Sequence, residues 1–314
     1  MTWEALPKIA CLGALVITGL LMAPLLDGVG RKIKARIQHR EGPPILQTLY
    51  DLTKLLRIPS LILGGTGFVL APLIAFSAAA SSLSLLPIGP SSPLSFSYDI
   101  FVYLYVLAMV SISLMIAGFS VQSAYANIGA NREMMMILST EPVLGIALGA
   151  LALVTGNLSI RGIVNAASHL GGLHLLMYLL TLCLLTYCVY IECGFIPFDL
   201  AEAETEILEG PLVEYSGWLL GMFKWALLIK RFSLIWLLTS FLTAPWLAGY
   251  QPTSLTITLA YLAQLAIAST LYSCMVTYEA LTPRHKIGWV VRSNLKAFII
   301  SIIYLAVVWW VTQS

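Results

Sequence analysis

Charged residues are scarce in this chain of 314 residues, because Asp, Glu, Lys and Arg together make up only 10% of it. Soluble domains carry about 25% charged residues. Apolar residues reach 59%, and the mean hydropathy is +0.89. This composition excludes an ordinary soluble domain and indicates an integral membrane protein. A formal net charge of +2 also gives no reason to expect nucleic acid as a partner.

The motifs of nucleotide and redox chemistry are also missing. The five cysteines form no C-x-x-C pair and mostly fall in apolar runs, so we interpret them as packing residues rather than disulfides or metal ligands. The sequence has no Walker loop and no G-x-G-x-x-G after a strand. We therefore expect no cofactor, no metal and no complete active site in this chain, with any redox chemistry residing in other subunits.

Apolar runs long enough to cross a bilayer occur about eight times. The fold class we predict is an all-α integral membrane protein, with residues 1–314 forming a single transmembrane domain. Lys224, Lys230 and Arg231 interrupt the sixth run, and we expect its first turns to tilt against cytoplasmic protein. The predicted spans are 6–26, 61–86, 98–120, 135–155, 173–193, 217–243, 255–278 and 296–313.

Basic residues predict the orientation of these spans. If the N-terminus is outside, only Lys8 and Arg161 of the 17 basic residues fall on the outward side. Cytoplasmic loops are the ones enriched in Lys and Arg, so we expect both termini outside. The inward loops are then 28–60, 121–134, 194–216 and 279–295.

One stretch, Ile191–Gly217, holds seven of the 15 acidic residues. No Lys or Arg occurs between Arg161 and Lys224, so no basic residue close in sequence neutralises them. Carboxylates so near lipid are costly unless they line a hydrated cavity enclosed by protein, where such groups often mark ion paths. The alternative is an acidic loop exposed to solvent.

Local signals predict the backbone of this stretch. Pro197 cannot lie inside a helix, so the preceding span should end by about Ile196. Asp199 has the spacing of an N-cap whose partner lies three residues later, which predicts a helix over 199–208 that stops before the Gly-Pro pair at 210–211. Such a helix would carry three carboxylates on one face: Glu202, Glu206 and Glu209.

Two further segments carry polar residues beside apolar spans. Glu141 lies some six residues into a span, next to Pro142, and is either a satisfied structural carboxylate or a group on a proton path; we favour the path. The simplest interpretation of Arg132 and Glu133 is no more than a local ion pair at the mouth of that span. Leucines at helical spacing between residues 46 and 56 predict an amphipathic helix at the membrane interface, on the inward side.

Several of these motifs resemble a known family. The run IPFDLAEAE at 196–204, followed by Glu-Tyr-Ser at 214–216, is similar to the signature of the membrane-anchor subunit of respiratory complex I. It resembles still more closely the equivalent subunit of energy-converting membrane-bound nickel–iron hydrogenases and formate hydrogenlyases. Glu-Gly-Pro-Leu at 209–212 replaces the Ala-Gly-Tyr/Phe-Asn of quinone-binding forms. The first loop also lacks the Asn-Arg-Val-Gly that complex I usually carries after its Gly-Pro.

The resemblance implies a subunit that docks a redox module on a prokaryotic cell membrane and couples electron transfer to proton or sodium translocation. The implied partners are hydrogenase-like large and small subunits, an iron–sulfur subunit and antiporter-like membrane subunits, with iron–sulfur clusters and a nickel–iron centre in those partners. A quinone-chamber subunit and a subunit of a sulfur-reducing complex remain alternatives. The candidate proton-path residues are Glu133, Glu141, Glu192, Asp199, Glu202, Glu204, Glu209 and Glu214. The candidate docking residues are Arg36, Arg40, Gly42, Pro43, Gln47, Asp51, Lys54 and Arg132.

Overall fold

A computed structural model of the chain describes residues 5–89, 92–201, 204–247 and 254–313, and within these ranges the secondary structure is helical, with no strand. Eight helices are long and apolar enough to cross a membrane, which confirms the predicted fold class. They are α1 (Ala5–Ile37), α3 (Thr66–Ser84), α4 (Asp99–Phe119), α5 (Ala124–Thr155), α7 (Gly172–Glu192), α9 (Gly217–Thr243), α10 (Ser254–Leu281) and α11 (Ile287–Gln313). The shorter elements are α2 (Gln47–Arg57), α6 (Ile160–Ala167), α8 (Glu204–Ile207), and the 3₁₀ turns η1 (Gly210–Glu214) and η2 (Ala244–Leu247).

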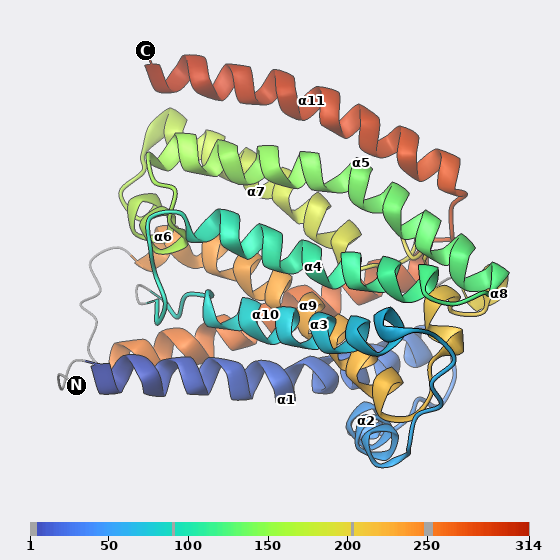
Figure 1. The fold of residues 1–314 in the computed structure, drawn as a ribbon. Helices are drawn as coiled ribbons and strands as arrows, with labels where there is room; N and C mark the ends of the chain where they lie inside the picture. The colour runs from blue at the N-terminus through green and yellow to red at the C-terminus, as the bar shows by residue number, and fades with distance from the viewer. Residues whose placement is uncertain (1–4, 90–91, 202–203, 248–253, 314) are drawn as a thin grey trace.

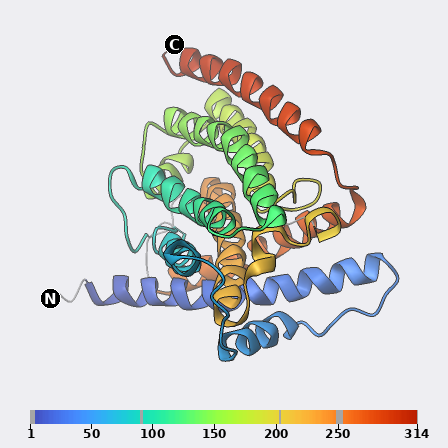
Figure 2. The same cartoon turned by 45° about the vertical axis from the view of Figure 1, so that its right-hand side comes forward.

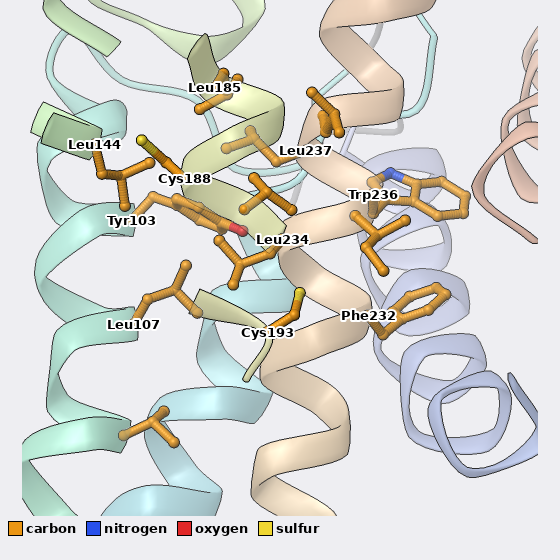
Figure 3. Close-up of a cluster of buried hydrophobic side chains, with 14 of the residues drawn as sticks. Tyr103, Leu107, Leu144, Leu185, Cys188, Cys193, Phe232, Leu234, Trp236 and Leu237 are labelled. Atoms are coloured by element: carbon orange, nitrogen blue, oxygen red, sulfur yellow. The ribbon is translucent and has the colours of Figure 1, made fainter. Parts of the chain in front are cut away.

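The long helices lie side by side, with both ends of the chain at one end of the bundle (Figure 1). The opposite end carries α2, α8 and the connection from α10 to α11, and we call it the charged end. Helix α9 is the centre of the bundle. Of its apolar membrane-spanning stretch of 18 residues, 72% is buried, against 17% for the same stretch of α11. Leu234 of α9 points toward Tyr103 of α4, whereas Phe232 and Trp236 lie on the opposite side of α9 (Figure 3). The Trp236 ring packs there against Tyr261 of α10, with ring centres 5.5 Å apart.

Two predicted loops are partly helical, because a neighbouring helix extends into each of them. Helix α1 continues to Ile37, so residues 28–37 of the segment expected as a loop are helical. Its 33 residues would span about 50 Å, well beyond a hydrocarbon core of about 30 Å. Helix α5 likewise begins at Ala124 and takes in most of the expected 121–134 loop. A hydropathy window cannot find such extensions, because they leave the lipid without ending the helix.

The predicted amphipathic helix is present as α2, and its apolar face packs on α9. Leu52 is buried, and Gly221 of α9 allows the close approach: a Cβ there would lie 3.1 Å from the Cβ of Leu55. Tyr50 and Leu61 are exposed beside it, at 57% and 69%. An exposed apolar rim of this kind is typical of a segment at a membrane interface, which stays our prediction for α2.

Candidate functional site

The acidic stretch folds differently from its prediction beyond residue 198. Helix α7 ends at Glu192, before Pro197 as expected, but the helix expected over 199–208 is wrong, because α8 covers only Glu204–Ile207. Leu208 and Glu209 both have positive φ, 52° and 66°, which ends the helix before Glu209. Glu209 therefore does not share a helical face with Glu206. Glu202 lies outside the described residues, as does the side chain of Glu204.

Packing explains why the helix stops there. The turn η1 lies against α5, where Gly129 has no side chain to keep it away. A Cβ on Gly129 would lie 2.6 Å from Cδ of Pro211 and 2.9 Å from Cα of Gly210. Gly210 itself has a φ of 55°, a conformation that glycine adopts at little cost. The chain must turn sharply to make this contact, which overrides the local capping signal.

A buried ion pair lies at the heart of the bundle. Nζ of Lys230, on α9, is 2.8 Å from Oε2 of Glu192 at the end of α7, and it also donates to Oγ of Ser111 on α4 at 2.7 Å. The two charged side chains are only 7% and 11% exposed. Removing charges from water is expensive, so each must be compensated by its partner and by further hydrogen bonds.

This pair lines a small cavity, which we call the central cavity. It has a volume of about 60 Å³, and its polar walls include Ser111, Glu133, Thr140, Glu192, Lys230 and Arg231. That volume is enough for a water molecule, and the polar walls supply hydrogen-bond partners. Glu133 has no cation within 4 Å among the described residues, although it shares the cavity with Lys230. The cavity is thus a polar compartment surrounded by apolar helices.

The loop after α7 is held by two arginines, one from α9 and one from the connection between α10 and α11. Nε of Arg231 donates to the backbone oxygen of Cys193 at 2.6 Å, and its guanidinium lies 5.6 Å from the ring centre of Phe195. Nη2 of Arg284 donates to Oδ2 of Asp199 at 2.7 Å. Burial raises the pKa of Asp199 above its ordinary value, and the positive charge of Arg284 opposes that rise.

A larger polar cavity, the charged chamber, lies between α1, α2 and α9 and has a volume of about 250 Å³. Four residues line both cavities: Gly194, Asp199, Leu227 and Arg231. Ion pairs lie along the walls of the chamber: Arg31 with Asp27 at 2.9 Å and with Asp51 at 3.6 Å, Lys34 with Glu279 at 2.7 Å, and Lys224 with Glu209 at 3.3 Å. Polar side chains therefore continue from the central cavity to the charged end.

Four of the predicted proton-path residues line the two cavities, and two others do not. Glu133 and Glu192 line the central cavity, Glu209 lines the charged chamber, and Asp199 lines both. Glu141 and Glu214 are half-buried and line neither cavity, although Thr140, next to Glu141, faces the central one.

The predicted docking residues are also dispersed. Arg36, Arg40 and Lys54 are exposed, Pro43 is half-buried, and Nε2 of Gln47 donates to Oδ1 of Asp51 at 2.9 Å. Gly42 packs on α1, where a Cβ would lie 2.9 Å from that of Ala35. Arg132 forms its ion pair with Glu206, at 2.6 Å, rather than with the neighbouring Glu133.

Most of the cations that neutralise the acidic stretch were not among the site residues predicted from the sequence. We expected Lys230 to lie against cytoplasmic protein, whereas it is buried inside the bundle. A lysine within an apolar run is as informative as a carboxylate there, so the signal that selected Glu141 was present at Lys230 too. Asp27 lies in the polar extension of α1, Glu279 in the last turn of α10 and Arg284 in the connection to α11, where the sequence carries no comparable signal.

Comparison with known proteins identifies the relatives of this chain. The NADH dehydrogenase family profile matches residues 9–311. Formate hydrogenlyase subunit 4 and hydrogenase-4 component C of Escherichia coli are 36% and 35% identical over 213 and 215 residues, which cover 67% and 68% of this chain and 69% and 68% of those proteins. A subunit of the NADH-quinone oxidoreductase of Orientia tsutsugamushi is 29% identical over 302 residues, covering 91% of this chain and 86% of that one.

A solved structure is similar along nearly the whole length. A chain of the membrane-bound sulfane sulfur reductase, an archaeal respiratory membrane complex, matches with a TM-score of 0.83 at 26% identity. The match covers 96% of this chain and 100% of that one. These relatives confirm the resemblance to the complex I and membrane-bound hydrogenase subunits that the motifs indicated. The chain belongs to the NADH dehydrogenase family.

Proposed function

We propose that this chain is the membrane subunit of a multisubunit oxidoreductase of the membrane-bound hydrogenase type. It docks a redox module at the charged end and couples electron transfer to translocation of protons or sodium ions. The relatives named formate hydrogenlyase subunit 4 and hydrogenase-4 component C support this assignment, as does Glu-Gly-Pro-Leu at 209–212. The iron–sulfur clusters and a nickel–iron centre belong to the partner subunits.

The observation that carries the proposal is that the two polar cavities adjoin and share four lining residues. Glu133, Glu192 and Lys230 lie in the interior, and Asp199 and Arg231 line both the central cavity and the charged chamber. A charge that appears in the chamber changes the energy of charges in the central cavity, because Coulomb interactions are strong where water is scarce. Redox events at the charged end can therefore drive proton or ion movement inside the bundle.

The charged end is the proposed seat of the hydrophilic partners. Arg36, Arg40 and Lys54 are exposed there, beside the amphipathic helix α2. We infer that hydrogenase-like large and small subunits and an iron–sulfur subunit sit on this surface, while antiporter-like subunits join within the membrane. The charged end then faces the cytoplasm, and both termini lie outside the prokaryotic cell membrane, as the distribution of basic residues favours.

Two other functions within the family compete with this one. In a complex I-like oxidoreductase the charged chamber would hold quinone, and the relative from an NADH-quinone oxidoreductase favours that function. In a sulfur-reducing complex the same membrane subunit would serve another acceptor, as the structural neighbour suggests. The ion pairs in the chamber walls favour the hydrogenase type, since a quinone ring gains little from burial among charges. Stoichiometric quinone in the purified complex would overturn this choice.

The experiment is ion translocation per electron in membrane vesicles. Glu133→Gln and Glu192→Gln keep the shape of each side chain and remove its titration, so we expect translocation to fall at least about tenfold while the complex still assembles. Glu206→Gln is the matched control, because Glu206 is 48% exposed and bonds Arg132 outside both cavities. Glu141→Gln tests whether the path leaves the central cavity along α5. Normal translocation in both Glu133→Gln and Glu192→Gln, at full abundance, would show that the buried carboxylates are structural.

A further inference from the structure

A third hollow opens between α7, α10 and α11, and neither the central cavity nor the charged chamber includes it. Helices α10 and α11 diverge from their connection at the charged end (Figure 2). The groove between them has a volume of about 500 Å³. Its walls come from the last turns of α7 and α10 and the first turns of α11, so it lies at the charged end of the transmembrane region.

The walls of this groove are largely apolar and aromatic. Leu271, Met275 and Tyr278 of α10 face Tyr190 of α7 and Trp289 of α11. Trp and Tyr are enriched at the level of the lipid headgroups, where one end of the ring is apolar and the other wet. The composition matches the boundary between acyl chains and headgroups.

Two basic residues neighbour, in sequence, the residues that line the groove at the charged end. His285 lines it and packs against Trp289, with ring centres 4.1 Å apart. Lys286 and Arg292 lie beside these residues in sequence, are exposed and have no acidic partner within 4 Å in the part of the chain that the structure describes. No Asp or Glu among the described residues lines the groove. The positive charge is therefore available to a ligand.

We propose that this groove binds an anionic phospholipid. The phosphate lies at the mouth, near His285, Lys286 and Arg292, and an acyl chain lies along Leu271 and Met275. Basic pockets between transmembrane helices at the cytoplasmic surface bind anionic headgroups in this way, and long basic side chains can reach the phosphate from within the membrane. An apolar partner helix would gain nothing from the unpaired cations, whereas an anionic lipid satisfies both parts of the groove.

Fluorescence quenching by brominated lipid tests the proposal, because bromine quenches nearby tryptophan. The assembled complex, in detergent, is titrated with brominated phosphatidylglycerol or brominated phosphatidylcholine. The signal of Trp289 is the difference between the wild type and Trp289→Phe. We expect phosphatidylglycerol to quench this signal at a concentration at least about threefold lower, and the double variant Lys286→Glu/Arg292→Glu to lose the preference.

The matched control is Arg57→Glu/Arg161→Glu, which changes the net charge equally at exposed positions outside the groove and should keep the preference. Equal quenching by the two lipids, or a preference that survives in Lys286→Glu/Arg292→Glu, would overturn the proposal. A Trp289 signal that neither lipid quenches would assign the groove to a partner protein instead. If the two lipids quench equally and added quinone relieves that quenching, the groove would be assigned to an isoprenoid tail.

Discussion

The buried pair of Lys230 and Glu192 gives the sharpest test of the proposed site. Lys230→Met keeps an unbranched apolar stem only one atom shorter than lysine and removes the charge. Glu192 then loses the cation 2.8 Å away, while Ser111 loses its donor at 2.7 Å. We expect a large loss of stability, because an uncompensated carboxylate remains in the bundle.

The distance sets the size of the effect. At an effective dielectric constant of about 20, two unit charges 2.8 Å apart attract by about 6 kcal/mol. Measured losses on breaking buried pairs are about 3–5 kcal/mol, since the site relaxes. The entropy of unfolding a chain of 314 residues converts that loss into a fall of about 5–8 °C in melting temperature.

The assay is thermal unfolding of the complex in detergent, followed by intrinsic fluorescence, at equal protein concentration. Lys224→Met is the control, because Lys224 lies on the same helix and pairs with Glu209 at 3.3 Å, but both side chains are about a third exposed or more, at 39% and 35%. Such a pair contributes at most about 1 kcal/mol. If Lys230→Met melts within a degree of Lys224→Met, the central pair contributes no more than a surface pair and the reasoning fails.

The packing, the exposed cations and the charge distribution each give a further prediction. Gly129→Ala should destabilise the fold by about 1–3 kcal/mol through contact with Pro211, whereas Gly145→Ala, with nothing within 4 Å, should be neutral in the same melting assay. Reversing Arg36 and Arg40 to Glu should release the hydrophilic partners during mild purification; an intact, salt-resistant complex would contradict the docking proposal. Single introduced cysteines at the charged end should label only from the cytoplasm, and labelling from outside would reverse the orientation.

The sequence was sufficient for the spans because lipid imposes a constraint that is local in the chain. Each crossing needs about twenty apolar residues, so a window finds it without knowledge of its neighbours. Helix α2 was also predicted from a local pattern, the helical spacing of its leucines. The extensions of α1 and α5 were missed because a helix that leaves the membrane becomes polar without ending.

The site was less predictable because its compensating charges come from far along the chain. Lys230 is 38 residues from Glu192, and Arg284 is 85 residues from Asp199. A stretch without its own Lys or Arg therefore looked unneutralised, although other parts of the bundle supply cations to it. The capping signal at Asp199 failed for the same reason: its carboxylate bonds Arg284, and the packing of Gly210 on Gly129 fixes the turn.

The double variant Lys230→Met/Glu192→Gln separates structure from coupling. Removing both charges leaves no isolated ion from this pair in the bundle, and replacement of a buried pair by neutral groups is often close to neutral for stability. We therefore expect the double variant to recover most of the stability that Lys230→Met loses.

Ion translocation in the double variant then tests the coupling role. If the pair serves only to hold α7 against α9, ion translocation should recover together with stability. If Lys230 instead carries the electrostatic link between the central cavity and the charged chamber, the double variant should assemble, transfer electrons and fail to translocate ions. Recovery of translocation together with stability would refute the coupling role of Lys230 and leave the pair as a structural contact.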